Sequence, residues 1–181
     1  MSLSARLKPG ETMGDRVMKV DHAGEHGAIC IYRAQRFFAR WTAPEMVAEL
    51  DEFLTHERRH RNRFGAELSR RGRGRCRSYF FCGLGGFMLG SATGIAGRGA
   101  IAATTVAIER VVLRHMQEQL ETLASTDKAA AAALRDVIAD EQSHHDLSAA
   151  RIPNGGGLWA KVIDPVVAAS TEAVIWLGMR L

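Results

Sequence analysis

Two copies of one residue pattern constrain the fold of this chain more than any other feature. Glu57 and His60 form a Glu-x-x-His pair, and Glu141 and His144 form a second one. Three residues of α-helix place a glutamate and a histidine on the same side, about one turn apart. Each pair therefore predicts a helix that carries two ionisable groups on one face.

A single glutamate precedes each pair by the same distance. Glu25 lies 32 residues before Glu57 (57 − 25), and Glu109 lies 32 residues before Glu141 (141 − 109). The chain thus repeats a hairpin in which a helix with one glutamate is followed by an antiparallel helix with Glu-x-x-His. Two such hairpins packed together bring four carboxylates and two imidazoles to the middle of a four-helix bundle. That set is typical of ferritin-like proteins with two iron or two manganese ions.

These ionisable residues interrupt apolar stripes that should be buried. The stripes run through residues 46–64, 102–116 and 134–148, with steps of three and four residues between apolar positions. An ionised carboxylate in an apolar core is very costly unless it is paired or binds a metal. Glu25 lies one position off the cleanest apolar face, but Gly24 and Gly27 beside it would leave room for a metal or a substrate.

The donor set indicates which metals would fit. Four carboxylates of charge −1 balance two ions of charge +2, and carboxylate oxygens with two imidazoles suit iron or manganese. The three cysteines (Cys30, Cys76 and Cys82) lack the spacing of zinc or iron–sulfur sites and are expected to be reduced thiols. The alternatives are buried ion pairing of Glu, His and Arg without a metal, and a helix register that does not bury these residues. The predicted metal ligands are Glu25, Glu57, His60, Glu109, Glu141 and His144.

The whole chain is predicted to be all-α, since no segment shows a convincing strand period. We expect helices over residues 15–40, 44–71, 100–123, 128–150 and 158–181, the last being an apolar C-terminal helix after a loop at 152–157. Residues 1–14 are expected to be a flexible N-terminus without the layout of a signal peptide, and residues 15–181 a single domain.

An uncharged segment of twenty positions, Ser78–Gly97, lies between the two hairpins and is about as long as a membrane span. Its Gly86, Gly90 and Gly94 are spaced four apart, which lets another helix approach closely. A cationic stretch beside an apolar one is attracted to anionic lipid headgroups. We therefore expect an extra short apolar helix on or dipping into one leaflet; a full span and a buried core helix are the alternatives. The cationic stretch is Arg70, Arg71, Arg73, Arg75 and Arg77.

Other polar residues have less specific interpretations. His115, six residues after Glu109, is a candidate hydrogen-bond or proton-relay group. Asp140 and Asp21 could accept hydrogen bonds from ligand imidazoles, a role that carboxylates usually have at metal sites. For Asp21 a solvated helix face is the alternative. Four histidines are expected at the surface or behind the ligands rather than as ligands: His22, His26, His56 and His145.

Several motifs together resemble those of the demethoxyubiquinone hydroxylases, and the similarity runs from about Gly14 to Leu181. The motifs are Asp21-His-Ala-Gly-Glu25-His-Gly-Ala28, Ile31-Tyr-Arg-Ala-Gln35, Glu57-x-x-His60, Gly86-Phe-Met-Leu-Gly90, Thr105-Val-Ala-Ile-Glu109 and Asp140-Glu-x-x-His-His-Asp146. The resemblance implies a membrane-associated, ferritin-like monooxygenase with two iron ions, held by the six residues above, with Glu57 and Glu141 bridging. Its reaction would insert one oxygen atom of O2 into the ring of demethoxyubiquinone during ubiquinone biosynthesis.

The same resemblance implies partners and a location. The substrate carries an isoprenoid tail that lies in the bilayer, the reductant is NADH or the quinol, and a ubiquinone-biosynthesis complex is a further candidate partner. The expected location is peripheral, at the cytoplasmic face of the cell membrane, and no nucleic acid is expected.

Three other functions remain open at the level of sequence. A tRNA-modifying di-iron hydroxylase is one, because the net charge of +4 and the arginine cluster could bind phosphate. A ferritin-like iron oxidase or storage bundle is another, which would consume iron and O2 without an organic product. The third is a lipid-surface binding protein with a vestigial site.

Overall fold

The computed structural model describes residues 4–152 and 158–181. Within these ranges the chain forms helices and no strand, which confirms the predicted all-α fold. The predicted loop at 152–157 lies outside the described residues except for Ile152. The elements are α1 (Met13–Thr42), η1 (Pro44–Met46), α2 (Val47–Arg70), α3 (Tyr79–Ala96), α4 (Arg98–Leu123), α5 (Lys128–Ala150) and α6 (Leu158–Gly178).

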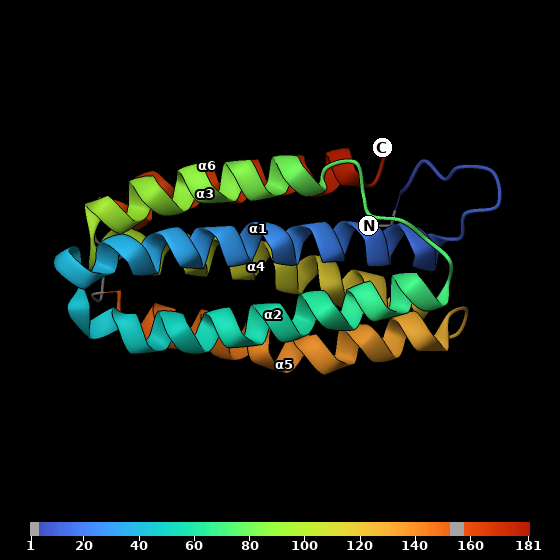
Figure 1. Ribbon diagram of the computed structural model, residues 1–181, viewed down its shortest axis with the longest axis horizontal. Coiled ribbons are helices and arrows are strands. Elements are labelled where there is room, and N and C mark those ends of the chain that lie inside the picture. The colour runs from blue at the N-terminus through green and yellow to red at the C-terminus, as the bar shows by residue number, and fades with distance from the viewer. Residues whose placement is uncertain (1–3, 153–157) are drawn as a thin grey trace.

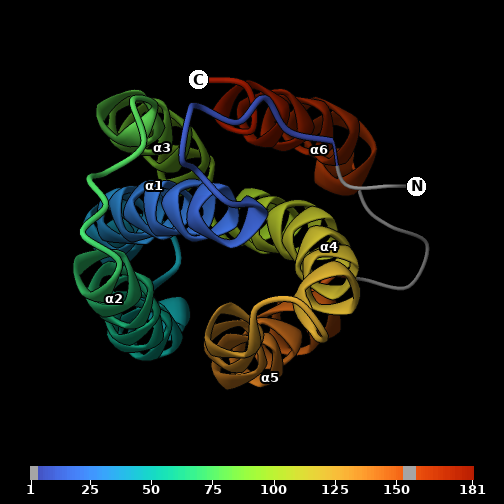
Figure 2. The same ribbon diagram turned by 90° about the vertical axis from the view of Figure 1, so that its right-hand side faces the viewer.

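The helices form three layers of two (Figures 1 and 2). Helices α1, α2, α4 and α5 make a four-helix bundle, while α3 covers α1 and α6 covers α4. Helices α1 and α2 run antiparallel, as do α4 and α5 (Figure 1). The chain therefore forms the two hairpins that the repeat predicts, in a ferritin-like bundle with two additional helices.

Local signals set the ends of several helices. The hydroxyl of Thr12 accepts a hydrogen bond from the backbone of Asp15, whose carboxylate accepts one from the backbone of Thr12. This capping box begins α1. Pro44 begins the 3₁₀ turn η1, where the lack of an N–H costs nothing. Asp127 caps α5 and also binds Arg71, which ties the end of α2 to the start of α5.

The residues just before α1 are part of the folded domain. Glu11 is buried, with its carboxylate 2.6 Å from Nη2 of Arg16 and 2.7 Å from Nζ of Lys19. Met13 and Gly14 already lie in α1. Residues 11–14 thus do not belong to a flexible tail, and the division of the remaining N-terminus stays a prediction.

The apolar core lies in two parts along the bundle. Leu50, Phe53 and Ile101 belong to one cluster of buried side chains, and Phe64 and Leu134 belong to the other. On α2 the Glu-x-x-His pair lies between Phe53 and Phe64. The ionisable groups therefore occupy the middle of the bundle, with apolar packing on both sides of them.

Helix α3 packs against α1 through its glycines. A Cβ at Gly86 would lie 2.3 Å from the carbonyl oxygen of Gly27, and one at Gly90 would lie 2.3 Å from that of Ile31. A side chain at either position would push the helices apart. The close approach predicted from the four-residue spacing is confirmed, and it fixes α1, which carries Glu25.

We expect Gly90→Ala to destabilise the fold by about 1–3 kcal/mol, because the new methyl group meets the backbone of Ile31. The control is Gly85→Ala on the same helix, where a Cβ has no atom within 4 Å. That variant should be neutral or more stable by up to about 1 kcal/mol, since alanine favours helix over glycine. Thermal unfolding measures both, and equal melting temperatures would contradict the close contact.

The arginine cluster is partly neutralised within the chain. Arg70 and Arg71 pair with Glu67, and Nη2 of Arg73 lies 2.9 Å from a carboxylate oxygen of Asp15. Less positive charge is therefore available to lipid or nucleic acid than the sequence suggests.

Helix α6 is the apolar C-terminal helix that the sequence predicts. It ends at Gly178 rather than at residue 181, and its side toward α4 carries two acids. Asp164 pairs with Arg110 at 2.9 Å, and Glu172 pairs with Arg114. These exposed ion pairs join α6 to α4, and Val167 of α6 is buried in the core, while other side chains of α6 are apolar and exposed.

Candidate metal centre

All six predicted ligand residues meet in the middle of the bundle, at the centre of its four helices. Each of them is at most 5% exposed to solvent. They come from every bundle helix: Glu25 from α1, Glu57 and His60 from α2, Glu109 from α4, and Glu141 and His144 from α5.

The six residues form two overlapping groups of four. Within each group, one ligand atom from every residue lies within 4.8 Å of those of the other three. Two adjacent cations that share a pair of carboxylates would require this arrangement, and Glu57 and Glu141 belong to both groups. The first group is Glu25, Glu57, His60 and Glu141, and the second is Glu57, Glu109, Glu141 and His144.

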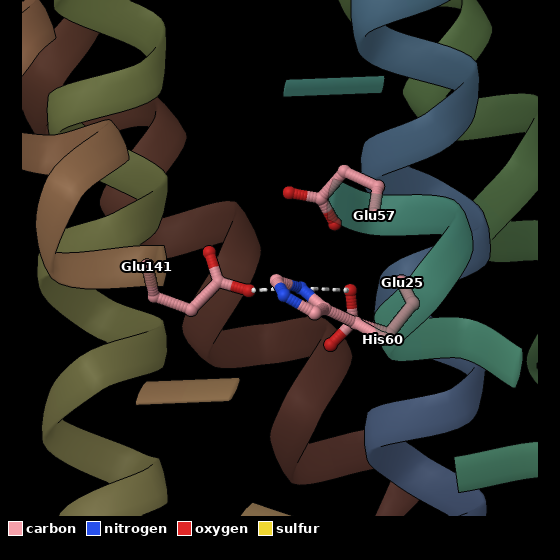
Figure 3. Close-up of side chains that lie close together, drawn as sticks. All are labelled: Glu25, Glu57, His60 and Glu141. Atoms are coloured by element: carbon pink, nitrogen blue, oxygen red, sulfur yellow. Dashed lines mark ion pairs between the residues drawn. The ribbon is translucent and has the colours of Figure 1, made fainter. Parts of the chain in front are cut away.

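Unpaired atoms within the cluster test whether a cation fits. Nδ1 of His60, Nδ1 of His144 and Oε1 of Glu57 have no hydrogen-bond partner among the described residues. Nδ1 of His60 lies 3.0 Å from Oε1 of Glu141 and 3.7 Å from Oε2 of Glu25, and Figure 3 shows the ring between the two carboxylates. Buried polar atoms are nearly always satisfied. Cations among these atoms would satisfy them, so the residues fit metals that prefer carboxylate and imidazole.

The protonation of the cluster depends on burial and on the close pairing of its groups. Burial raises the pKa of Glu25 and of Glu109 well above the ordinary value. Burial alone would lower the pKa of His60 and of His144, but the contact of each ring with Glu141 outweighs it. The pKa of His60 is raised to about 12 and that of His144 to about 9. A metal must displace the protons that these groups hold, so metal binding should weaken as the pH falls.

Each histidine of the cluster is held from behind by the residue that precedes the glutamate of the other motif. Nε2 of His60 lies 2.8 Å from Oδ2 of Asp140, and Nε2 of His144 lies 3.1 Å from Nδ1 of His56. A partner on Nε2 leaves Nδ1 of each ring facing the carboxylates. The contact predicted for Asp140 is confirmed, and His56 lies behind His144, one of the two places expected for it.

Tyr32 also contacts the cluster, and its hydrogen bond to Glu109 was not expected from the sequence. Its hydroxyl donates a hydrogen bond of 2.6 Å to Oε1 of Glu109, and its side chain is fully buried. Burial raises the pKa of Tyr32 well above the ordinary value, so it remains a donor at neutral pH. One sequence signal could have found it: Tyr32 lies seven residues after Glu25, two turns along the same face of α1.

A cavity of about 280 Å³ opens beside the cluster, between α1, α3, α4 and α6. The four glutamates line one part of it, and most other lining side chains are apolar, among them Ile31, Phe81, Leu89 and Val112. An apolar cavity with a few polar groups is the usual form of a small-molecule site.

The two glycines beside Glu25 have different roles. Gly24 lines the cavity, and a Cβ there would have no atom within 4 Å, so it leaves the room that the sequence predicts. At Gly27 a Cβ would lie 3.3 Å from the carbonyl oxygen of Cys82. Gly27 therefore serves the packing of α3 on α1 as well as the cavity.

The remaining histidines lie apart from the six clustered residues. His115 lines the cavity, and its Nε2 lies 2.8 Å from Oε2 of Glu172; its role as a relay stays a prediction. His26 stacks on Tyr79 with 4.0 Å between ring centroids. His22 stacks on the same ring, and the partly exposed His145 pairs with Asp146.

Both interpretations of Asp21 from the sequence were wrong. The residue is buried rather than solvated, and the partner of its carboxylate among the described residues is Gln119, not an imidazole. Nε2 of Gln119 donates to Oδ1 of Asp21 at 3.1 Å. Asp21 is four residues before Glu25, so it faces the same cavity one turn closer to the N-terminus of α1.

The stability of the fold should depend on the protonation of Asp21. Burial raises the pKa of Asp21 to about 7 from its usual 3.8. The unfolded chain therefore loses this proton near pH 4 while the folded chain keeps it, so stability falls as the pH rises from about 4 to about 7. We expect Asp21→Asn to remove that loss, making the variant more stable than the parent by up to about 4 kcal/mol at pH 8.

Urea unfolding of the metal-free protein at pH 4.5 and pH 8 measures this effect. The gain from Asp21→Asn should fall to about 1 kcal/mol at the lower pH, because the unfolded chain has lost most of this proton at pH 4.5 as well. Glu52→Gln, at an exposed position on α2 whose side chain has no ion-pair or hydrogen-bond partner among the described residues, is the control and should be as stable as the parent at both pH values. An Asp21→Asn variant as stable as the parent at pH 8 would contradict the burial of an ionisable group at this position.

Comparison with known proteins agrees with this geometry. A family model described as "Ubiquinone biosynthesis protein COQ7" matches residues 12–178. The chain is 30% identical over 172 residues to the NADPH-dependent 3-demethoxyubiquinone 3-hydroxylase, mitochondrial, of Bos taurus, an alignment that covers 92% of this chain and 77% of the relative. It is 29% identical over 171 residues to the 3-demethoxyubiquinol 3-hydroxylase of Rhodospirillum rubrum, covering 92% and 78%. Since the family match spans almost all of the described chain, this protein belongs to the family of the ubiquinone biosynthesis protein COQ7.

Proposed function

We propose that this protein is a monooxygenase of ubiquinone biosynthesis, which inserts one oxygen atom of O2 into the ring of demethoxyubiquinone or its quinol. The observation that carries the proposal is the pair of buried residue groups that share Glu57 and Glu141 beside an apolar cavity. The relatives are named as hydroxylases of 3-demethoxyubiquinone and 3-demethoxyubiquinol, and family membership extends that activity to this chain.

Two iron ions are the cofactor we propose, held by the six clustered residues. When bound, they would supply the redox chemistry that activates O2. Asp140 and His56 orient the two imidazoles, and Tyr32 fixes one oxygen of Glu109 by donating a hydrogen bond to it. The protein thus orients the two imidazoles and one carboxylate of the cluster before a metal binds.

The cavity would hold the substrate ring against the four glutamates. Its apolar walls exclude water from the reacting edge of the ring, which limits side reactions. His115 is at the cavity wall and within hydrogen-bond distance of Glu172, so we propose it as the group that relays protons. NADH or the quinol is the proposed reductant, while the relative from Bos taurus is named as NADPH-dependent. A complex of ubiquinone-biosynthesis proteins is a further proposed partner.

The outer layer of α3 and α6 is the proposed membrane contact, since both helices lie on one side of the bundle (Figure 2). Helix α3 is long and apolar enough to span a membrane, with 39% of it buried. We propose that this layer lies on one leaflet, at the cytoplasmic face of the cell membrane, and that the isoprenoid tail enters the cavity between the two helices. Exposed apolar side chains of the layer include Phe80, Phe81, Leu84, Phe87, Met88, Val162, Val166, Trp176 and Leu177.

Truncating the aromatic side chains of α3 should release the protein from membranes. We expect a triple variant with Phe80, Phe81 and Phe87 changed to serine to remain in solution when vesicles with anionic lipid are floated, while the parent floats with them. Leu147→Ser is the control, because Leu147 is exposed on α5, in the layer furthest from α3 and α6. Unchanged flotation of the triple variant would count against this membrane face.

Hydroxylation itself is tested with iron-loaded protein, a short-tailed demethoxyubiquinol and ¹⁸O2. The expected result is a ring product that carries one ¹⁸O atom, detected by mass spectrometry. Consumption of O2 and Fe(II) without a ring product would instead support an iron oxidase.

A further inference from the structure

A polar pair lies in the otherwise apolar part of the cavity, apart from the six clustered residues. Asp21 on α1 is one turn before Glu25, and Gln119 on α4 is ten residues after Glu109. Both line the cavity, and their exposed fractions are 9% and 2%. As described above, the amide nitrogen of Gln119 donates to Oδ1 of Asp21.

Each member of this pair keeps one buried atom without a partner. Oδ2 of Asp21 and Oε1 of Gln119 have no hydrogen bond among the described residues. Buried polar atoms are nearly always paired, so two unpaired atoms on one cavity wall point to a ligand that pairs with them.

The hydrogen bond within the pair decides what each free atom offers. Gln119 uses its amide nitrogen on Asp21, so its free Oε1 can only accept. With a pKa raised by burial to about 7, Asp21 carries its proton in about half of the molecules at neutral pH and in most of them below it. Because Oδ1 is the acceptor for Gln119, the proton lies on Oδ2, which then donates. The wall presents one donor and one acceptor.

We propose that Asp21 and Gln119 recognise a ring hydroxyl group, which donates to Oε1 of Gln119 and accepts from Oδ2 of Asp21. A phenolic hydroxyl can do both, whereas a carbonyl oxygen can only accept and leaves Oε1 of Gln119 unpaired. The pair therefore selects the reduced, quinol form of a benzoquinone substrate. This inference rests on the proposed function, since it takes the substrate to be such a ring.

The placement of the pair also positions the ring for reaction. One helical turn, about 5.4 Å along the axis, separates Asp21 from Glu25. A ring held by its hydroxyl at the pair can thus direct its opposite edge toward the four glutamates. The selection survives ionisation of Asp21, because the single hydroxyl proton can then be donated either to the ionised carboxylate or to Oε1 of Gln119, and neither atom donates to a carbonyl.

Binding of two redox-inert probes to the iron-loaded protein tests the inference. The probes are a phenol with an apolar tail and its methyl ether, which keeps the shape but has no hydroxyl proton. We expect the parent protein to bind the phenol at least about tenfold more tightly, measured by equilibrium dialysis. Gln119→Met and Asp21→Leu should reduce this preference to less than about threefold.

Asp21→Asn separates recognition from a purely structural role. Asparagine keeps an oxygen for Gln119 and an N–H to donate, so this variant should retain the preference that Asp21→Leu loses. Thr171→Val is the control: Thr171 lines the cavity, but its hydroxyl donates to the backbone of its own helix. Its preference should equal that of the parent.

Two outcomes would overturn the inference: equal binding of phenol and ether by the parent, or an unchanged preference in both Gln119→Met and Asp21→Leu. The metal content and melting temperature of each variant are measured as well, to check that the fold is kept. Failure of the proposed function has a different signature, because it appears as the absence of ¹⁸O in the ring product of the parent protein. A phenol preference that depends on the pair, without such a product, would keep the hydroxyl site and reject the hydroxylase.

Discussion

Glu141→Gln should abolish the binding of both metals and lower ring hydroxylation about a thousandfold or more. Oε1 of Glu141 lies 3.0 Å from Nδ1 of His60, and Oε2 lies 3.3 Å from Nδ1 of His144. Each oxygen therefore serves a different half of the cluster. Glutamine keeps the shape but replaces one oxygen by an amide nitrogen that has no lone pair for a metal, and it removes the charge that both halves share.

The loss of iron in each variant should depend on whether the changed residue belongs to one or to both of the groups of four. Glu25 belongs to the first group alone, so Glu25→Gln is expected to lose one iron of the two and keep the other partly bound. Glu118→Gln is the control, because Glu118 lies on α4 outside the cluster and partly exposed. Metal analysis after reconstitution with Fe(II) gives iron per chain for each variant. Two irons per chain in Glu141→Gln would contradict the shared role of this carboxylate.

The cluster could be predicted from the sequence because helix geometry converts spacing into position. Glu57 and His60 lie on one face wherever the helix runs, and a repeat of that pair implies a second helix facing the first. The structure brings all six residues together as the spacing requires. The two-hairpin architecture followed from the same repeat, without any knowledge of the loops.

Contacts between distant elements could not be predicted in the same way. Asp21 and Gln119 are 98 residues apart, and no periodic pattern links them. The contact of His56 with His144 likewise depends on how one hairpin faces the other. Arg71 looked like part of a free basic stretch, yet the fold brings it to Asp127. Such pairings depend on the packing of helices, which a local sequence pattern does not encode.

The composition of α3 predicted some features of its packing but not its partner helix. Its length, lack of charge and glycine spacing predicted an apolar helix with one closely packed side, and Gly86 and Gly90 do face α1. Composition could not say which helix would receive that side. The answer depends on α1 having Gly27 at the point of contact, where the two backbones approach closely.

Binding of Fe(II) under anaerobic conditions should raise the melting temperature of the protein by roughly 10–30 °C. A ligand at a thousand times its dissociation constant contributes about 4 kcal/mol per site, and 1 kcal/mol corresponds to about 2–4 °C for a chain of this size. The gain should grow with pH, because the metals displace protons from groups such as His60, whose pKa is raised to about 12 by its contact with Glu141 after the opposing effect of burial. Differential scanning calorimetry with and without iron measures the gain.

A double variant with Glu25 and Glu109 changed to glutamine should be more stable than the parent when both are metal-free, and less stable than the parent when both are loaded with iron. Burial raises the pKa of both carboxyls above 4.5, their ordinary pKa and that of the unfolded chain. The metal-free protein therefore loses folding stability as the pH rises above about 4.5. Neutral amides avoid that loss, and the metal-free variant should melt above the metal-free parent at pH 7. Each half of its cluster then lacks one anionic ligand, so iron should stabilise it far less than the parent. A metal-free variant that melts below the parent would mean that these carboxylates stabilise the fold as ion pairs with the histidines, and the cluster would then need no metal to explain it.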